Sequence, residues 1–388
     1  MSMEICEQDE KLLLQFQRER GILTETLYNY KSAIYIYTTL HEMDMYELIE
    51  EAETEEEQGI RWKHRKLKQK LLEFRTYLYE TLTITTAKLY LTLIKTFYKH
   101  YEIEIHDLPS ISEKHAKKNP PLLYDDLITK KEIQKTLAIS DPKTRAIILF
   151  MCSSGCARTE THNITIQDFV DSLQEYIIKN DIYEIIKELG DRNDIVPTFK
   201  LKRQKTNQYY YTFCTPEATQ SIFSYLKQRK DTLEPDSKLF KFDKKYLSNK
   251  FRYMSEIICE FDKVGGHNKF RTHMLRKFHA SNLAKGKHPL TFEEIDMLQG
   301  RKKTGSRPSY FFDDPRHLKK KYIANMEQVT INQEIDTLTL ESPEVLEIKK
   351  EKQKIENENK EMKKNMRKYA FEFFKEIMSE EGRDNEIQ

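Results

Sequence analysis

Glycine and proline are scarce in this chain, which has 10 glycines and 11 prolines among 388 residues. Collagen-like chains and Pro/Gly-rich disordered chains need far more of both, so these classes are excluded. So few turn-forming residues favour long helices. Aromatic residues are abundant by contrast, with 22 Tyr and 20 Phe, and disordered chains lack them. The sequence therefore predicts a folded core beneath a heavily charged surface.

Long apolar runs and patterned cysteines are also missing. The longest apolar run covers residues 146–152, whereas a membrane-spanning helix needs about 20 residues. The first residues show neither the basic nor the apolar part of a secretory signal. A cytoplasmic protein with no membrane span is expected. Of the five cysteines, Cys152 and Cys156 lie one helical turn apart, but no second ligand pair lies nearby, so buried reduced thiols are favoured over a zinc site.

Charge is segregated along the chain, although the net formal charge is only +2. Residues 44–58 carry eight acids and no base, and residues 61–70 then carry six bases and no acid. Further basic runs occupy residues 200–205, 263–288 and 301–307, interleaved with Tyr and Phe. Such patches attract a polyanion such as nucleic acid. Solvated helix faces are the alternative explanation for each run.

Periodicity and composition divide the chain into four segments. A helical N-terminal bundle is followed by a linker with three prolines, a mixed second domain and a helical tail. The predicted fold class is mainly α with a small β-hairpin, the second domain being α+β. The segments cover 1–107, 108–124, 125–330 and 340–388.

Local patterns predict individual elements. Apolar residues recur at helical spacing in residues 24–40, in 64–80 and after Thr85, which is the expected N-cap of its helix. The acidic and basic runs between these helices are expected to form an exposed loop or helix end. In the second domain, Thr129-Lys-Lys-Glu is a capping box that opens a helix, and another helix is expected to begin at Pro216.

Two short β-prone runs, 196–202 and 208–214, flank a basic tip and predict a hairpin. The run from 173 to 189 fits neither helix nor strand clearly. In the tail, apolar residues recur every seven positions at Ile348, Ile355 and Met362, with polar residues on the companion position. A partner-binding coiled coil and a lone solvated helix both remain open for this tail.

Four motifs of the second domain carry residues suited to phosphate chemistry. Taken singly, each has a structural explanation, such as an arginine that caps a helix C-terminus or a solvated lysine. Their order, spacing and surroundings make the set more informative than its parts. In chain order the residues are Arg158 in Ser-Gly-Cys-Ala-Arg-Thr-Glu, Lys205 on the hairpin tip, His273 and Arg276 in Thr-His-Met-Leu-Arg, and Arg301 in Leu-Gln-Gly-Arg, followed by Tyr310.

Over about residues 125–325 this set resembles the catalytic domain of tyrosine recombinases, the phage-integrase and Xer family. The Gln-Gly-Arg form is similar to an archaeal branch of that family. The N-terminal segment matches the family's core-DNA-binding domain in position, size and helicity. The resemblance implies a site-specific recombinase or integrase that acts on double-stranded DNA, with four protomers on two DNA sites and no metal or cofactor.

The resemblance also implies roles for the site residues. Arg158 and Arg276 would offer paired donors to the non-bridging oxygens of a phosphodiester, and Arg301 would add another donor. Tyr310 would attack the phosphorus and form a covalent phosphotyrosine. Lys205 would protonate the leaving 5′-oxygen, with Lys202 or Arg203 as replacements, and His273 would assist proton transfer.

Two departures from the family pattern stand out. The family spacing is Gly-x-Arg-x-x-Glu, whereas this chain has Gly155-x-x-Arg158-x-Glu160, so the arginine is displaced by one residue if Glu160 keeps its register. Arg301 replaces the usual histidine or tryptophan.

Other functions remain open at this point. A relative that cuts and rejoins DNA without strand exchange, like type IB topoisomerases, would carry the same motifs. A catalytically inactive DNA-binding regulator would fit the displaced Arg158 and the replaced histidine. A coiled-coil scaffold would account for the tail alone.

Overall fold

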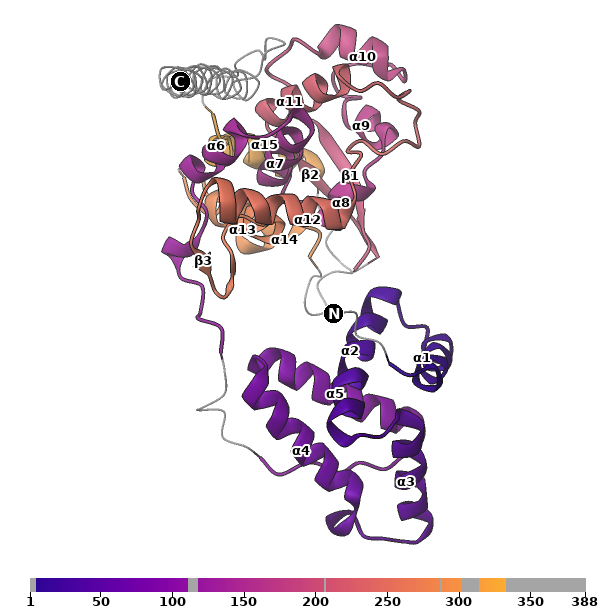
Figure 1. Cartoon of the computed structure of the whole chain (residues 1–388). Helices are drawn as coiled ribbons and strands as arrows, with labels where there is room; N and C mark the ends of the chain where they lie inside the picture. Colours follow the sequence, from indigo (N-terminus) through magenta and orange to yellow (C-terminus); the bar gives the residue numbers. More distant parts are fainter. Residues whose placement is uncertain (1–4, 111–117, 206, 287, 302–313, 333–388) are drawn as a thin grey trace, which may run out of the picture. The chain divides into compact units, whose positions relative to one another are not determined.

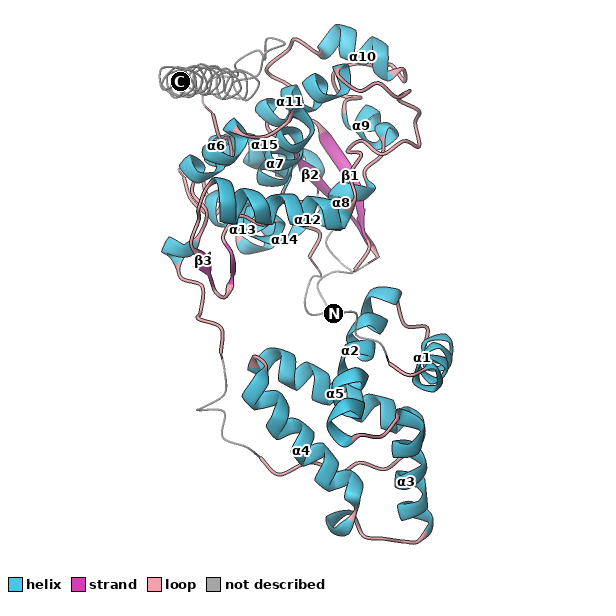
Figure 2. Ribbon diagram, viewed as in Figure 1, coloured by secondary structure: helices cyan, strands magenta, loops and turns pink. Residues whose placement is uncertain are grey.

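The computed structural model describes residues 5–110, 118–205, 207–286, 288–301 and 314–332. The chain divides into two compact units, Met1–Pro121 and Leu122–Gln388, each with its own hydrophobic core. Both units are mainly helical, and strands occur only in the second among the described residues (Figures 1 and 2). The mainly α fold class with a small β component is confirmed. The predicted tail, 340–388, lies outside the described residues.

Helices build the first unit. Its predicted helices at 24–40 and 64–80 are confirmed by α2 (Thr24–His41) and α4 (Lys66–Thr81). The predicted helix after Thr85 is present as α5, but its N-cap is Thr83, because the helical hydrogen bonds already begin there: the Ala87 amide donates to the Thr83 carbonyl at 2.9 Å. The elements are α1 (Glu7–Arg20), α2 (Thr24–His41), α3 (Met45–Glu57), the 3-10 helix η1 (Trp62–His64), α4 (Lys66–Thr81) and α5 (Ile84–His100).

The acidic and basic runs of this unit pair with each other in part. The acidic run is a helix and not a loop, although the junction of the two runs, residues 58–64, is largely exposed as expected. The acidic run forms α3, and the basic run leads into α4 beside it. Glu55 is buried and accepts hydrogen bonds from the first amides of α4, at 2.7 Å from Lys66 and 3.4 Å from Leu67. Glu51 pairs with Lys66 and Lys70. Much of the basic charge here is therefore neutralised within the unit.

The second unit holds the remaining described elements. Its helices are α6 (Lys130–Ala138), α7 (Pro142–Ser154), α8 (Arg158–Asn163), α9 (Ile166–Ser172), α10 (Ile182–Leu189), α11 (Pro216–Lys227), α12 (Lys244–Tyr253), α13 (Thr272–Leu283), α14 (Phe292–Leu298) and α15 (Pro315–Asn325). Short helical turns are η2 (Tyr124–Asp126), the π-helical η3 (Met254–Ile258) and η5 (Met326–Gln328). Its strands are β1 (Thr198–Arg203), β2 (Gln208–Phe213), β3 (Lys263–Val264) and β4 (His267–Asn268).

Several local predictions for this unit are confirmed. The capping box at Thr129 opens α6, and α11 begins at Pro216. The hairpin is β1 paired antiparallel with β2, in a register that sets Arg203 opposite Gln208. The ambiguous run from 173 to 189 contains α10. A second hairpin, β3–β4, was not predicted, although its Gly265-Gly266 turn, with φ of +57° and +75°, is a typical hairpin signal.

The apolar run 146–152 is the buried interior of α7, the central helix of this unit. Helices α11 and α13 pack against α7 (Figure 1). On α15, the fully buried Tyr322 donates from its hydroxyl to the Ser153 carbonyl of α7 at 2.9 Å. Cys152, Cys156 and Cys214 are buried free thiols, as expected. Within the described ranges, no helix has the length and apolar character that crossing a bilayer requires.

Candidate active site

The site is built around the glycine that ends α7. Gly155 has a φ of +65°, the left-handed conformation that ends many helices. A Cβ at this position would lie 2.5 Å from Nδ1 of His279, which is closer than atoms can approach. Glycine is therefore required twice here, for its backbone conformation and for the contact with His279. The turn directs the Gly155 carbonyl toward α13.

Arg276 of α13 receives that carbonyl. Its Nη1 donates to Gly155 O at 2.5 Å, and its Nη2 donates to Gln299 O at 2.6 Å. The side chain is almost fully buried, with the residue 5% exposed. Burial, together with the nearby charge of Arg203, lowers the pKa of Arg276, although an arginine stays protonated in proteins. The first, third and fourth sequence motifs therefore meet at this guanidinium.

Two buried side chains, Gln299 and His279, support the position of Arg276. Gln299 donates from Nε2 to the Arg276 carbonyl at 3.1 Å and lies 3.1 Å from Nδ1 of His279. Because the amide of Gln299 is the donor, the His279 ring is neutral with an unprotonated Nδ1. Burial, and then the charges of Arg276 and Arg301, lower the pKa of His279 to about 3.

His273 lies one helical turn before Arg276, in the first turn of α13. The residue stays in part accessible to solvent. The burial of the rest of it lowers its pKa, and so do the charges of Lys277, Arg271, Arg276 and Arg301. The ring is consequently neutral at neutral pH and free to accept a proton.

Arg203, at the end of β1, brings the hairpin into the same cluster. Its Nη1 donates to Gly300 O at 2.8 Å and lies 3.4 Å from Gln299 O. Its Nε is 3.8 Å from a carboxylate oxygen of the buried Glu160. Among the described residues, neither the buried Nε of Arg203 nor Oε2 of Glu160 has a hydrogen-bond partner. The second motif thus joins the other three through Arg203.

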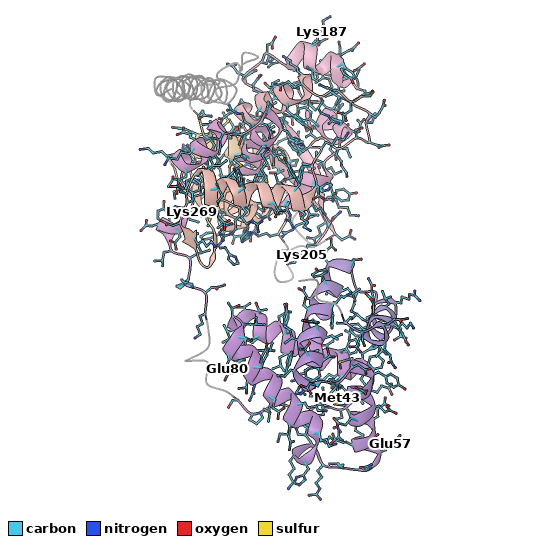
Figure 3. All side chains as sticks on the ribbon, in the orientation of Figure 1. Met43, Glu57, Glu80, Lys187, Lys205 and Lys269 are labelled. Carbon is cyan, nitrogen blue, oxygen red and sulfur yellow. The ribbon has the colours of Figure 1, made fainter. Side chains whose placement is uncertain are left out.

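The lysines of the hairpin stay in solvent. Lys205 is exposed beyond the end of β1 and is labelled at the hairpin tip in Figure 3. Lys202 is exposed as well, with its Nζ 5.6 Å from the centre of the Tyr209 ring. Either ammonium group can move toward a bound phosphate without breaking a buried contact.

Arg158 is directed elsewhere. It is the first residue of α8, and its Nη1 donates to Ser248 Oγ and, at 3.4 Å, to Lys244 O, both on α12. The structure therefore does not bring Arg158 into contact with Arg276. Its assignment as a phosphate ligand stays a prediction.

Gly300 and Arg301 follow α14 at the edge of the cluster. Gly300 has a φ of +59°, and a Cβ there would lie 2.6 Å from the Tyr210 ring, so the turn after α14 also needs glycine. Arg301 is exposed and pairs with Asp296 at 3.1 Å. The predicted nucleophile, Tyr310, lies outside the described residues. Within the described ranges, no group of three or more His, Cys, Asp or Glu side chains is placed to hold a metal ion.

Sequence reasoning missed Gln299 and His279 as supporting residues and treated Arg203 only as a replacement proton donor. Gln299 belongs to a motif that was singled out and His279 follows another by three residues, but a linear pattern does not say which side chains turn inward. Arg203 lay just beyond the predicted strand 196–202, in the basic tip, so the sequence assigned it neither a strand face nor a neighbour.

Comparison with known proteins gives matches only among solved structures. No protein-family model and no curated protein matches the chain. A structure of the XerA recombinase is 16% identical with a TM-score of 0.34, over 81% of this chain and 97% of that one. Lambda integrase residues 75–356, bound as a dimer to a core site, are 13% identical with a TM-score of 0.48, over 79% and 97%. XerH bound to its difH substrate is 14% identical with a TM-score of 0.47, over 82% and 84%. Likeness at this level concerns the backbone, so an activity has to be argued from the site's own residues.

Proposed function

We propose that this protein is a site-specific DNA recombinase or integrase that cleaves and rejoins DNA through a covalent 3′-phosphotyrosine intermediate. The observation that carries the proposal is the meeting of four sequence motifs around Arg276. Its guanidinium is held by two backbone carbonyls, and no carboxylate of the described residues is hydrogen-bonded to it. Carbonyls orient the group without cancelling its charge, so the positive charge stays available to an anionic phosphate.

The proposed reaction conserves the energy of the phosphodiester. The Tyr310 oxygen attacks phosphorus, and the bond from phosphorus to the 5′-oxygen breaks as the new bond forms. Arg276 and Arg301 stabilise the charge that develops on the non-bridging oxygens. Preorganised donors of this kind contribute roughly 3–4 kcal/mol each. Rejoining reverses the same steps, and the mechanism uses no metal.

Protons move through two further residues in this mechanism. Neutral His273 takes the proton of the tyrosine hydroxyl, which its lowered pKa permits at neutral pH. Lys205 gives a proton to the departing 5′-oxygen. The exposure of Lys205 on the hairpin tip suits a group that reaches the phosphate only once DNA is bound.

Double-stranded DNA is the proposed partner, with a tetramer assembled on two paired sites. The basic runs 200–205 and 263–288 belong to the unit that carries the cluster. Contacts to phosphates would position the protein. DNA affinity should consequently fall steeply as salt rises.

Covalent capture tests the proposal. Phosphorothiolate-bearing duplexes that tile the DNA around the protein's own gene trap a cleaved complex, because the departing sulfur cannot rejoin. The wild-type protein should form an adduct on denaturing gels, and Tyr310→Phe should form none. Tyr322→Phe is the matched control, because Tyr322 is fully buried and bonded to Ser153 O.

Each alternative corresponds to a distinct result. An adduct that persists in Tyr310→Phe would move the nucleophile elsewhere. DNA binding without any adduct would support the inactive regulator. Relaxation of supercoiled DNA by a monomer would support an enzyme that cuts and rejoins without strand exchange. Deletion of 340–388 tests the tail, which contributes to assembly only if the deletion weakens the complex on DNA.

A further inference from the structure

Charge develops on two non-bridging oxygens when a phosphodiester is attacked. One guanidinium is therefore not enough to stabilise the charge on both oxygens. In the cluster, Arg276 supplies the first. Arg301, the additional donor of the proposed mechanism, is exposed and already paired with Asp296. The sequence pattern gave the second to Arg158, yet Arg158 is engaged with α12. A second guanidinium therefore has to come from another residue close to Arg276.

Helix geometry explains why Arg158 points away. Residues of an α-helix advance by about 100° each, so positions two apart lie on nearly opposite faces. Glu160 is buried and faces Arg203. Arg158, two residues earlier at the start of the same helix, is accordingly on the other side. The residue before it, at the position that the family spacing would give to the arginine, is Ala157.

Arg203 occupies the place beside Arg276. Both guanidinium groups approach the same atom, Gln299 O, at 3.4 Å from Nη1 of Arg203 and 2.6 Å from Nη2 of Arg276. Arg203 is the less buried of the two, with its side chain 16% exposed, so it reaches solvent where a ligand would arrive. Its Nε is buried and faces Glu160. The exposed part of the side chain, and not Nε, is therefore what a phosphate can reach.

We infer that Arg203, on the hairpin, is the second phosphate-binding guanidinium of the site and acts with Arg276 on the scissile phosphate. The inference rests on the proposed function. It gives Arg158 a different task, which is to tie the start of α8 to α12. Glu160 then orients Arg203 through a long ion pair, because its carboxylate is 3.8 Å from Nε, which is too far for a hydrogen bond.

The competing explanation is that Arg203 only ties the hairpin to the end of α14. Arg229 offers a matched control for that role, because its Nη1 also donates to two consecutive carbonyls, at 2.8 Å to Lys238 and 3.2 Å to Leu239. Arg229→Ala removes such a tie elsewhere in the same unit. Comparison of the two variants separates lost packing from lost catalysis.

The experiment measures the rate of adduct formation on two suicide duplexes, one with the ordinary scissile phosphate and one with a neutral methylphosphonate at that position. Arg203→Ala should slow cleavage of the ordinary duplex by about 10²–10³-fold. On the neutral linkage its deficit should shrink at least tenfold, since less charge needs stabilising. Arg229→Ala should cleave both duplexes near the wild-type rate below its melting temperature. Arg158→Ala should retain far more activity than Arg203→Ala.

Three results would overturn the inference. In the first, Arg203→Ala cleaves at the wild-type rate. In the second, it loses the same activity on both duplexes. In the third, Arg158→Ala loses more activity than Arg203→Ala, and the neutral linkage restores the activity of Arg158→Ala. If Arg203→Ala does not fold, Arg203→Lys serves, with an expected loss of at least tenfold that the neutral linkage again reduces. Failure of the wild-type protein to form any adduct would instead refute the proposed function, and the inference with it.

Discussion

His279 makes the stability of the second unit sensitive to mild acid. The ring is completely buried beneath Gly155, and its pKa in the fold is about 3. In the unfolded chain the same ring has a pKa near 6.5. Between these two values the unfolded state binds a proton that the native state does not, so stability falls as pH falls. The loss starts near pH 6.5 and is complete near pH 3.

Its size follows from the same two values. One pKa unit corresponds to about 1.4 kcal/mol, and pH 5 lies about 1.5 units below the unfolded pKa, so the fold loses about 2 kcal/mol between pH 8 and pH 5. The activity of the proposed site should fall over the same pH range as the stability of the second unit. A protonated Nδ1 cannot accept from Gln299, whose backbone carbonyl holds Arg276.

The assay is urea unfolding of the full chain at both pH values. The only tryptophan, Trp62, belongs to the first unit, so its fluorescence reports that unit, and the remaining far-UV circular dichroism transition reports the second. The perturbation is His279→Gln, which removes the titrating group and keeps an acceptor. The wild-type second unit should lose about 2 kcal/mol more than the variant. Equal pH dependence in the two proteins would refute the reasoning. If the variant does not fold, an NMR titration of the wild type should show one histidine that stays neutral down to pH 4.

Two further predictions concern packing. Gly155→Ala should destabilise the second unit by about 2–5 kcal/mol, because the new Cβ meets the His279 ring and the backbone stays left-handed; the same urea experiment measures this, and a loss below about 1 kcal/mol would contradict it. Glu55→Ala should weaken the first unit by about 1–2 kcal/mol by uncapping α4, seen as a shift of the Trp62 fluorescence transition that leaves the second unit unchanged.

Local elements were largely predictable from the sequence because their causes are local. The capping box at Thr129, the proline that opens α11 and the alternation in the β1–β2 hairpin are each contained in a few residues. The register of the α5 N-cap was missed because Thr83 and Thr85 both precede the apolar stripe, and side-chain type alone does not choose between them.

Pairing across the chain was harder to predict. Acids and bases in the first unit looked like an exposed block, yet Glu55 is buried on the start of α4 and Glu51 bridges two lysines. A run of charged residues shows the sign of the charge and its place in the sequence, but not which way each side chain points in the fold. A helix turns each successive side chain by about 100°, so a shift of one residue was enough to direct Arg158 to α12 instead of the cluster.

Backbone carbonyls, and not carboxylates, accept the hydrogen bonds of Arg276 and Arg203, which suits a phosphate site. A carboxylate beside Arg276 would neutralise the guanidinium and lower the attraction for a phosphate. Carbonyl oxygens of Gly155, Gln299 and Gly300 fix both guanidiniums through hydrogen bonds while their charges persist. Glu160 forms a long ion pair with Arg203, 3.8 Å from Nε, and so offsets part of that charge. Two like charges at one carbonyl repel each other, and an arriving phosphate relieves that repulsion. In the proposed mechanism, a bound phosphate therefore completes the electrostatics of the site.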